Sequence, residues 1–290
     1  MATKARGARP TRTEDQLGPK SANYHTHALT RGLVLLDLLA SVPPPLTLTG
    51  MHEHTGLPKS TLVRLLAALT EMRFVVRVDE RPAYRLGHKV MALADAYVSS
   101  LDLSAAAGTY LDTLSRETQQ TSNLGLLDGT EVVHVCVRTP DRPLRFETSP
   151  GARDSAHCTG LGKMLLAGVD PAELSAHLPP EPYAARTDRT ITTLDEMSKE
   201  IRRTARRGHG IDDNEGSTGL KCVAVPVTVG GQMLAALSVS GPAGEFGREK
   251  QKDYLERLHE TAEALAADYD VVAVLRRMYE SLGESPTRRA

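Results

Sequence analysis

The chain has 290 residues, which is long enough for two domains, and 40% hydrophobic with 24% charged residues is an ordinary globular composition rather than a disordered one. No run of about 18 apolar residues occurs, and the charged N-terminus is not followed by an apolar segment, so we expect a cytoplasmic protein without a membrane span or secretion signal. The cysteines Cys136, Cys158 and Cys222 lie far apart without CxxC spacing, which argues against disulfides and against a structural zinc site.

The net charge of −1 is unevenly distributed along the chain. Residues 1–20 carry five Lys or Arg against two acids, residues 21–100 carry eight against six, and the remainder carries 22 against 28. A basic first third on an acidic remainder suits a head that contacts nucleic acid and a body that does not.

The first 22 residues contain almost no large apolar side chains and are rich in Ala, Arg, Thr, Pro and Gly. Such a segment cannot bury enough surface to offset the entropy of ordering, so we predict a disordered arm over residues 1–22. A solvated tail is the favoured role for this arm, and contact of Arg6, Arg9 and Arg12 with DNA is the alternative.

Three helices are predicted next. Leucines at helical spacing indicate a first helix over 28–40, ended by three prolines at 43–45. Thr49 is a suitable N-cap for a short second helix that Gly56 ends, and Pro58 suits the first turn of a third helix over 57–72.

The third helix has two different faces. Its apolar positions Leu62, Leu65, Leu66, Leu69 and Met72 fall on one side, and Ser60, Val63, Arg64 and Ala67 fall on the other. The outer face is small, hydroxylated and cationic, with no acid before Glu71, so it could lie in a DNA major groove with its N-terminal amides near phosphate. A solvated helix face is the alternative.

After Met72 the apolar pattern changes to a period of two. Residues 74–78 and 83–86 alternate on either side of a polar turn, which predicts a β-hairpin. Helix, helix-turn-helix and hairpin in this order predict a winged helix-turn-helix domain over 23–87, with Arg81 at the wing tip and Arg77 and Arg85 nearby for backbone or minor-groove contact.

The rest of the chain predicts an α+β body. A linker helix is expected over 88–102, and a domain over 103–281 precedes a frayed tail over 282–290. The expected strands are 121–127, 131–138, 144–148, 221–229 and 232–240, and the expected helices are 103–119, 158–168, 171–177, 194–207 and 247–280. The turns Asp128-Gly129 and Gly230-Gly231 favour hairpins, so the sheet should be mostly antiparallel, with helices flanking it.

Residues 157–163 place Gly160 and Gly162 at a helix start, where backbone amides could meet an anion. The segment is not a phosphate-binding Walker A loop, because His157 stands where the first glycine would be and Met164 follows Lys163. Two interpretations stay open, a carboxylate site with Leu161 as an apolar wall and a plain helix start.

The acidic run 212–215 resembles a metal loop, but no Glu closes it at the twelfth position, so a solvated loop is favoured. Cys222 begins an apolar strand and is either a buried inert thiol or part of a ligand pocket. Ser238 and Ser240 share one strand face, where two hydroxyls need partners, and a polar ligand is one possibility.

Sequence motifs for catalysis are missing. Neither HExxH nor GxSxG occurs, and no spacing supports a triad that includes His157 and Cys158. We therefore expect no enzyme activity, no catalytic residue, no metal and no cofactor.

Several segments, in order, resemble the IclR family of transcriptional regulators. They are residues 55–66, Phe74-Val75, Tyr84-Arg85-Leu86-Gly87, residues 157–167, residues 219–227 and Ser238-Val239-Ser240-Gly241-Pro242. The resemblance extends from about residue 25 to 275 and implies a winged helix-turn-helix head, a linker helix and a GAF-like (profilin-like) effector domain. It also implies dimers or tetramers on palindromic operator DNA.

Carried over by motif, the resemblance assigns DNA contact to Lys59, Ser60, Thr61 and Arg64 and a small-molecule pocket to Gly160, Leu161, Asp212, Cys222, Ser238 and Ser240. The chain departs from the family at Leu161, where Ala is common, and at 214–217, where a Glu-Glu-His-like run is common. The function expected is a regulator switched by a carboxylate or aromatic metabolite. The alternatives are a constitutive DNA-binding protein whose body only oligomerises and an enzyme that uses the pocket.

Overall fold

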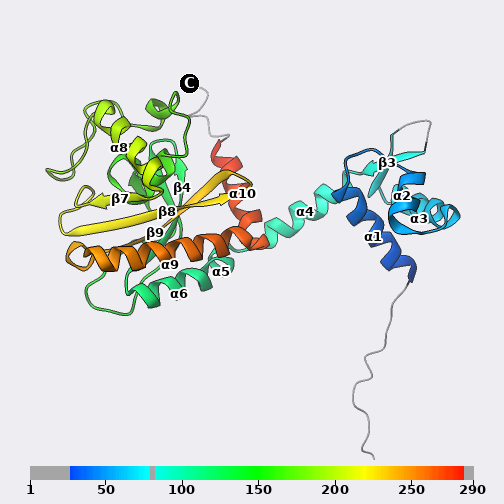
Figure 1. Ribbon diagram of the computed structural model, residues 1–290, viewed down its shortest axis with the longest axis horizontal. Helices are drawn as coiled ribbons and strands as arrows, with labels where there is room; N and C mark the ends of the chain where they lie inside the picture. The colour runs from blue at the N-terminus through cyan, green and yellow to red at the C-terminus, as the bar shows by residue number, and fades with distance from the viewer. Residues whose placement is uncertain (1–26, 79–81, 284–290) are drawn as a thin grey trace, which may run out of the picture. The chain divides into compact units, whose positions relative to one another are not determined.

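The computed structural model describes residues 27–78 and 82–283, and these residues form two compact units (Figure 1). The boundary between the units falls between Asp95 and Ala96, inside helix α4 (Lys89–Ser100). The predicted N-terminal arm and Arg81 lie outside the described residues. The predicted tail begins too early at 282, because the last helix continues to Gly283.

The N-terminal unit has the order of elements that the sequence predicts. Its elements are α1 (His27–Ser41), β1 (Leu46–Thr47), α2 (Leu48–Thr55), α3 (Lys59–Glu71), β2 (Val75–Arg77) and β3 (Ala83–Leu86). The strands form an antiparallel sheet in the order β1-β3-β2. Its core consists of Leu35, Leu39, Met51, Leu62, Leu66 and Val75. Three helices followed by a small sheet form a winged helix-turn-helix, as predicted.

Two local predictions in this unit are wrong. The N-cap of α2 is Thr47 rather than Thr49, because the Thr47 hydroxyl accepts the Gly50 N–H at 3.2 Å. Met72 is 61% exposed instead of facing the core. The helix ends at Glu71 and Arg73 has a φ of +62°, so helical spacing no longer places Met72 above Leu65 and Leu69.

The C-terminal unit is built on a six-stranded antiparallel sheet, in the order β6-β5-β4-β9-β8-β7. Its strands are β4 (Thr121–Asp128), β5 (Glu131–Arg138), β6 (Arg153–Ser155), β7 (Gly210–Asp213), β8 (Leu220–Val229) and β9 (Gln232–Pro242). Its helices are α5 (Leu103–Ala106), α6 (Gly108–Thr118), α7 (Gly160–Leu166), α8 (Leu194–Arg207), α9 (Arg248–Ala267) and α10 (Tyr269–Gly283), with short 3₁₀ turns at Ala156–Cys158, Leu174–His177 and Ala243–Glu245.

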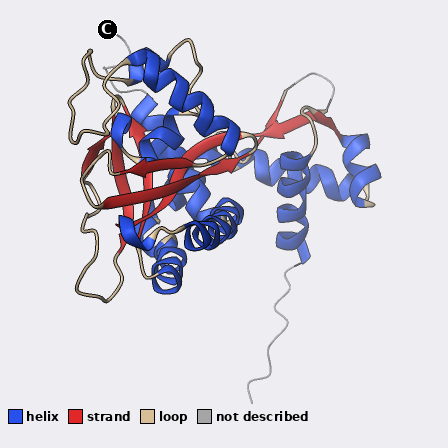
Figure 2. Ribbon diagram, turned by 60° about the vertical axis from the view of Figure 1, so that its left-hand side comes forward, coloured by secondary structure: helices blue, strands red, loops and turns tan. Residues whose placement is uncertain are grey.

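Helices cover both faces of this sheet, as Figure 2 shows. Helices α5, α6, α9 and α10 pack on one face, and α7 and α8 pack on the other. Along β8, Val223, Val225 and Val227 join the first core, whereas Ala224 joins the second. This period of two follows from the alternation of side chains along a strand and confirms the α+β architecture with flanking helices.

The two predicted hairpins are present. Asp128 pairs with Glu131 across the β4–β5 turn, and Val229 pairs with Gln232 across the β8–β9 turn. Gly129 and Gly230 both have a φ of +60°, a conformation that glycine adopts without a steric penalty.

The predicted strand over 144–148 is wrong, and the edge strand is β6 instead, where Val132 pairs with Asp154. In the 144–148 segment, the Phe146 carbonyl accepts a hydrogen bond from the Thr121 hydroxyl at 2.6 Å instead of one from the backbone N–H of a neighbouring strand. The apolar alternation there reflects a loop that turns Phe146 inward. Strand β7 was not predicted, because its four residues contain only one large apolar side chain.

Three predicted helices differ from the structure. Residues 171–177 form only a 3₁₀ turn over Leu174–His177. The helix predicted over 103–119 is interrupted at Ala107, between α5 and α6. The helix predicted over 247–280 is two helices, because the Asp268 carboxylate accepts the N–H groups of Asp270 at 3.0 Å and Val271 at 3.1 Å and so caps α10.

Within the described part of the chain, no helix combines the length and apolar character needed to cross a membrane.

Candidate nucleic-acid interface and ligand pocket

The outer face of α3 is exposed and cationic. Ser60, Val63 and Arg64 are exposed, and Thr61 is half-buried beside the buried Leu62. The Lys59 ammonium donates to the Thr49 hydroxyl at 3.1 Å, which connects the first turn of α3 to α2. A helix-turn-helix of this kind can place the first two turns of α3 against DNA.

The N-terminus of α3 has no side-chain cap, because Pro58 occupies the capping position. The Pro58 carbonyl accepts the N–H groups of Thr61 at 2.9 Å and Leu62 at 3.0 Å. Among the described residues, the N–H groups of Lys59 and Ser60 have no acceptor. Two amides at the positive end of a helix are therefore available to a phosphate.

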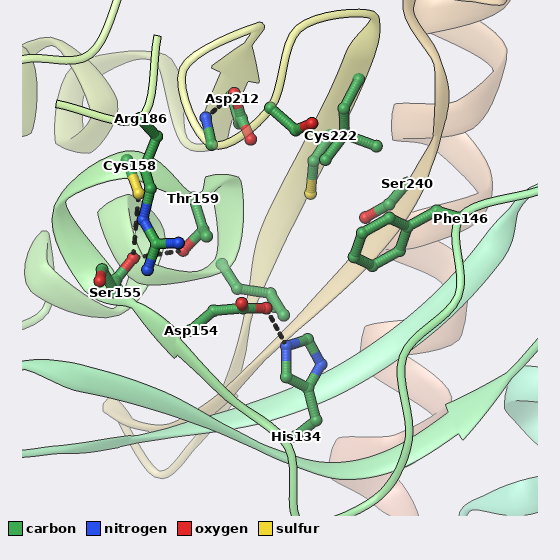
Figure 3. Close-up of a pocket in the computed structure, with 14 residues that line it drawn as sticks. His134, Phe146, Asp154, Ser155, Cys158, Thr159, Arg186, Asp212, Cys222 and Ser240 are labelled. Carbon is green, nitrogen blue, oxygen red and sulfur yellow. Dashed lines mark hydrogen bonds and ion pairs between the residues drawn. The ribbon is translucent and has the colours of Figure 1, made fainter.

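The C-terminal unit contains a cavity of about 230 Å³ at the end of the sheet face that α7 covers (Figure 3). The walls come from β5, β6, β7, β8, β9, the start of α7 and three loops. The lining residues are His134, Phe146, Asp154, Ser155, Cys158, Thr159, Leu161, Arg186, Asp212, Gly216, Ser217, Leu220, Cys222 and Ser240.

Four of the six predicted pocket residues line this cavity: Leu161, Asp212, Cys222 and Ser240. Gly160 lies behind the wall, where a Cβ atom would come within 2.9 Å of the Cys222 sulfur. Ser238 precedes Ser240 by two residues on β9 and is fully buried. Its hydroxyl accepts a hydrogen bond from the Asn123 side-chain amide at 3.4 Å. Gly160 thus allows α7 to approach β8, and Ser238 belongs to a buried polar network.

The amides at the start of α7 are partly occupied by the protein itself. The Thr159 hydroxyl accepts the Gly162 N–H at 3.1 Å and so caps the helix. Leu161 contributes an apolar wall, as expected, while the N–H of Gly162 is not open to a ligand.

Asp212 is not part of a solvated loop, contrary to the sequence prediction. Only 1% of its surface is exposed, because Asp212 lies on β7 and pairs with Cys222 of β8. Its Oδ1 accepts the N–H groups of Glu215 at 2.7 Å and Gly216 at 3.3 Å. Burial raises the pKa of Asp212 to about 6, although these hydrogen bonds act in the opposite direction.

A buried ion pair lies beneath this loop. The ammonium of Lys163, which is 1% exposed, donates to the Glu215 carboxylate and to the Ile211 carbonyl at 2.8 Å. Burial raises the pKa of Glu215, and the Lys163 charge opposes that shift. Glu215 is thus another acid that the sequence wrongly placed in solvent, and it fixes α7 to the loop that carries Asp212.

The two cysteines of the cavity are poor nucleophiles. Burial raises the pKa of Cys158 and the pKa of Cys222 to about 11 each. Both side chains are therefore neutral thiols at physiological pH, which leaves no thiolate for covalent catalysis.

Sequence reasoning missed a group of polar residues at the cavity. His134 Nε2 lies 2.9 Å from Asp154 Oδ2, and this contact lowers the pKa of Asp154. The alternation along β5 could have placed His134 on one sheet face, but nothing in the sequence indicates that Asp154 pairs with it. Arg186 comes from a long loop that carries no pattern at all. No group of three or more His, Cys, Asp or Glu suited to a metal occurs among the described residues.

Comparisons with known proteins agree with the architecture. Residues 28–79 match the IclR helix-turn-helix domain, and residues 95–267 match the domain described as bacterial transcriptional regulator IclR C-terminal. The HTH-type transcriptional regulator XynR of Escherichia coli (strain K12) is 32% identical over 240 residues, which are 82% of this chain and 95% of XynR.

Two further proteins extend the similarity. The regulator KdgR of the same organism is 31% identical over 221 residues, which are 76% of this chain and 84% of KdgR. The crystal structure of the repressor BlcR from Agobacterium tumefaciens has a TM-score of 0.64 at 29% identity, covering 85% of this chain and 98% of BlcR. All three proteins are named as regulators or repressors rather than as enzymes.

Proposed function

The chain belongs to the IclR family of bacterial transcriptional regulators, and from this premise we propose that a small molecule bound in its C-terminal cavity controls its affinity for operator DNA. The observation that carries the proposal is the cavity itself, which places the buried carboxylate of Asp212 and the hydroxyl of Ser240 around an open volume of about 230 Å³. A regulator of this kind acts in the cytoplasm, where its DNA is.

In this proposal α3 is the recognition helix. Ser60, Thr61 and Arg64 read base edges in the major groove, and Lys59 together with the open amides of the first turn contacts phosphate. Arg81, which lies outside the described residues, contacts the backbone from the wing tip. Two heads on a palindromic operator read half-sites about 34 Å apart, one turn of the DNA helix.

Exposed apolar side chains support a dimer. On α1 they are Leu29, Leu33 and Val34, and on α4 they are Met91, Leu93 and Tyr97. No residue of α4 is buried in the single chain, so this helix gains most by packing against a second copy. Dimers pair further into tetramers if the C-terminal units also associate.

The switch requires a physical connection from the cavity to α4. Strand β9 carries Ser240 on the cavity side, and α10 packs against the opposite face of the same sheet. Arg277 of α10 donates to the Ser99 hydroxyl at 2.8 Å, and the Tyr97 and Tyr269 rings lie 6.3 Å apart. A ligand that favours one packing of sheet and α10 would thereby change the position of α4 and the spacing of two heads.

The test of this proposal is binding-site selection from random DNA, with and without a panel of small metabolites. We expect a palindromic site to be enriched and at least one metabolite to change operator affinity. By linkage, the operator must change the affinity for that metabolite by the same factor. A metabolite that binds without any effect on operator affinity would favour a constitutive regulator whose C-terminal unit only oligomerises.

Arg64→Ala tests the DNA-reading role separately. If Arg64 reads a base, the variant should lose about 1–3 kcal/mol of operator binding and specificity at one position. Arg202→Ala, an exposed arginine of α8 with the same change in charge, is the matched control and should bind the operator normally. Equal weakening on all sequences would assign Arg64 to phosphate contact instead.

A further inference from the structure

We propose that the cavity selects a small organic anion that also carries a hydroxyl or amino group, with Arg186 binding the anionic group and Asp212 accepting the hydrogen bond. This inference rests on the proposed function, because it names the chemistry of the effector. Neither the family motif nor the sequence pattern points to Arg186, so the assignment depends on the geometry of this chain.

Arg186 places a guanidinium group at the wall of the cavity. It lines the cavity, and among the described residues it forms no ion pair and its side chain donates no hydrogen bond. Figure 3 shows the guanidinium directed toward Asp154 and Thr159 at the side of the cavity. The nearby Asp154 carboxylate already accepts a hydrogen bond from the His134 ring at 2.9 Å. A guanidinium has five N–H donors in a planar fork, which suits a carboxylate.

The segment that carries Arg186 is held in place by the neighbouring loop. The Arg186 N–H donates to the Thr190 hydroxyl at 3.0 Å, and that hydroxyl donates to the Glu215 carbonyl at 2.7 Å. The Thr187 hydroxyl donates to the Asn214 carbonyl at 2.6 Å. These bonds fix Arg186 to the same loop that closes over Asp212, so the two side chains keep a defined relation across the cavity.

Asp212 offers the complementary group. Its Oδ1 accepts two backbone N–H groups, whereas its Oδ2 has no hydrogen-bond partner among the described residues, and only 1% of the residue surface is exposed. Figure 3 shows this second oxygen directed into the cavity. Because this oxygen is free to accept at the cavity that Asp212 lines, a donor on the ligand can form a hydrogen bond with it there.

The two groups also orient the ligand. The pKa of Asp212 is about 6, so the side chain is mostly ionised at pH 7 and would repel an anion placed beside it. The anionic group must then lie toward Arg186 and the donor toward Asp212. Phe146, Leu161 and Leu220 line the space between and suit a short carbon skeleton.

The size of the cavity limits this skeleton. A volume of about 230 Å³ is below the ~300–1,000 Å³ of cavities that hold drug-sized ligands. A hydroxy acid or amino acid with a small aliphatic or single-ring skeleton is the class that fits.

The test uses two matched sets of probes on the full-length protein, followed by isothermal calorimetry. The first set is lactate, propionate and lactamide, and the second is 3-hydroxybenzoate, benzoate and 3-hydroxybenzamide. Within at least one set we expect the hydroxy acid to bind about tenfold tighter than both the acid without the hydroxyl and the neutral amide. Equal binding of the neutral amide, or binding of no probe at about 10 mM, would overturn the inference.

Three variants assign the preference to residues. Arg186→Gln should weaken binding of the hydroxy acid about tenfold, so that the hydroxy acid no longer binds more tightly than the neutral amide. Asp212→Asn keeps the size of the side chain. In this variant the hydroxy acid should bind no more tightly than the acid without the hydroxyl. Arg189→Gln is the matched control, because Arg189 lies on the same loop but pairs with Asp213 at 3.2 Å outside the cavity. Thermal unfolding of each variant confirms that it is folded.

The same titrations, repeated with operator DNA, separate this inference from the proposed function. If a neutral compound changes operator affinity and Arg186→Gln has no effect, the proposed function stands and the inference is wrong. If a hydroxy acid binds through Arg186 but leaves operator affinity unchanged, the inference stands and the proposed switch is wrong.

Discussion

Replacing Lys163 by methionine is expected to destabilise the C-terminal unit strongly, because it leaves the Glu215 carboxylate buried without its cation. Lys163 is 1% exposed and Glu215 is 9% exposed. One Glu215 oxygen, Oε2, already has no partner, so the Lys163 ammonium is its main source of compensation. Methionine has nearly the same length and fills the same volume, which limits the effect to the lost charge and hydrogen bonds.

The expected loss follows from the burial of the pair. Removing one partner of a buried ion pair typically costs about 3–5 kcal/mol of unfolding free energy, because the remaining charge stays uncompensated. The double variant Lys163→Met/Glu215→Gln removes both charges and should recover more than half of that loss. Lys199→Met is the matched control, since Lys199 pairs with Asp195 on the surface and is 54% exposed, and it should change stability by less than about 0.5 kcal/mol.

The loss should also depend on pH in a defined direction. Burial already raises the pKa of Glu215, and removal of the Lys163 charge raises it further. A carboxyl with a raised pKa in the folded state loses stability as pH rises above its unfolded value of about 4.3, at up to ~1.4 kcal/mol per pH unit. The deficit of Lys163→Met should therefore shrink between pH 7 and pH 5.

Urea unfolding of the full chain, followed by far-ultraviolet circular dichroism at several pH values, measures these differences. The signal comes from the backbone, which is useful because the chain contains no Trp. A deficit as small as that of Lys199→Met, or one that does not change between pH 5 and pH 7, would refute the reasoning.

Three other changes test the fold and the cavity. Gly162→Ala should cost about 1–3 kcal/mol or more, because a Cβ there would lie 2.1 Å from the Ala156 carbonyl oxygen; an unchanged urea midpoint would contradict this close approach. Thr47→Ala should cost about 1 kcal/mol by removing the N-cap of α2, whereas Thr49→Ala should cost less, and the reverse order in thermal unfolding would restore the cap expected from sequence. The stability of Asp212→Asn relative to the unmodified protein should increase by about 3 kcal/mol as pH rises from about 4 to above 6. The pKa of Asp212 is about 6 in the folded state, so the carboxyl group loses its proton at a lower pH in the unfolded chain, and the unmodified protein loses stability over this range. A stability difference that is constant over this pH range would contradict the burial of Asp212.

Local chemistry made much of the fold predictable. The period of α3 places Leu62 and Leu66 in the core and leaves Arg64 exposed, because a helix of this length must turn one face inward. The two glycine turns of the C-terminal sheet have the positive φ that their hairpins need. Where the sequence prediction failed, as over 144–148 and at Asp268, a side chain or carbonyl found a different hydrogen-bond partner.

The cavity was predictable only in part. The family motif indicated four residues that the fold brings together at the cavity, Leu161, Asp212, Cys222 and Ser240. It also indicated Gly160 and Ser238, which do not line the cavity. Residues that come from loops were not predictable, because a loop has no period that assigns its side chains to a face.

The sequence by itself determined which segments form helices and hairpins, where α3 presents its cationic face, and that the chain has a winged head and an α+β body. These features depend on neighbouring residues and on the periods of helix and strand. Only the tertiary structure decided that Asp212 and Glu215 are buried, that Asp154 meets His134, and that Arg186 lies at the same cavity. Burial and charge pairing depend on residues far apart in the chain, and strand β7 against β8 brings those residues together.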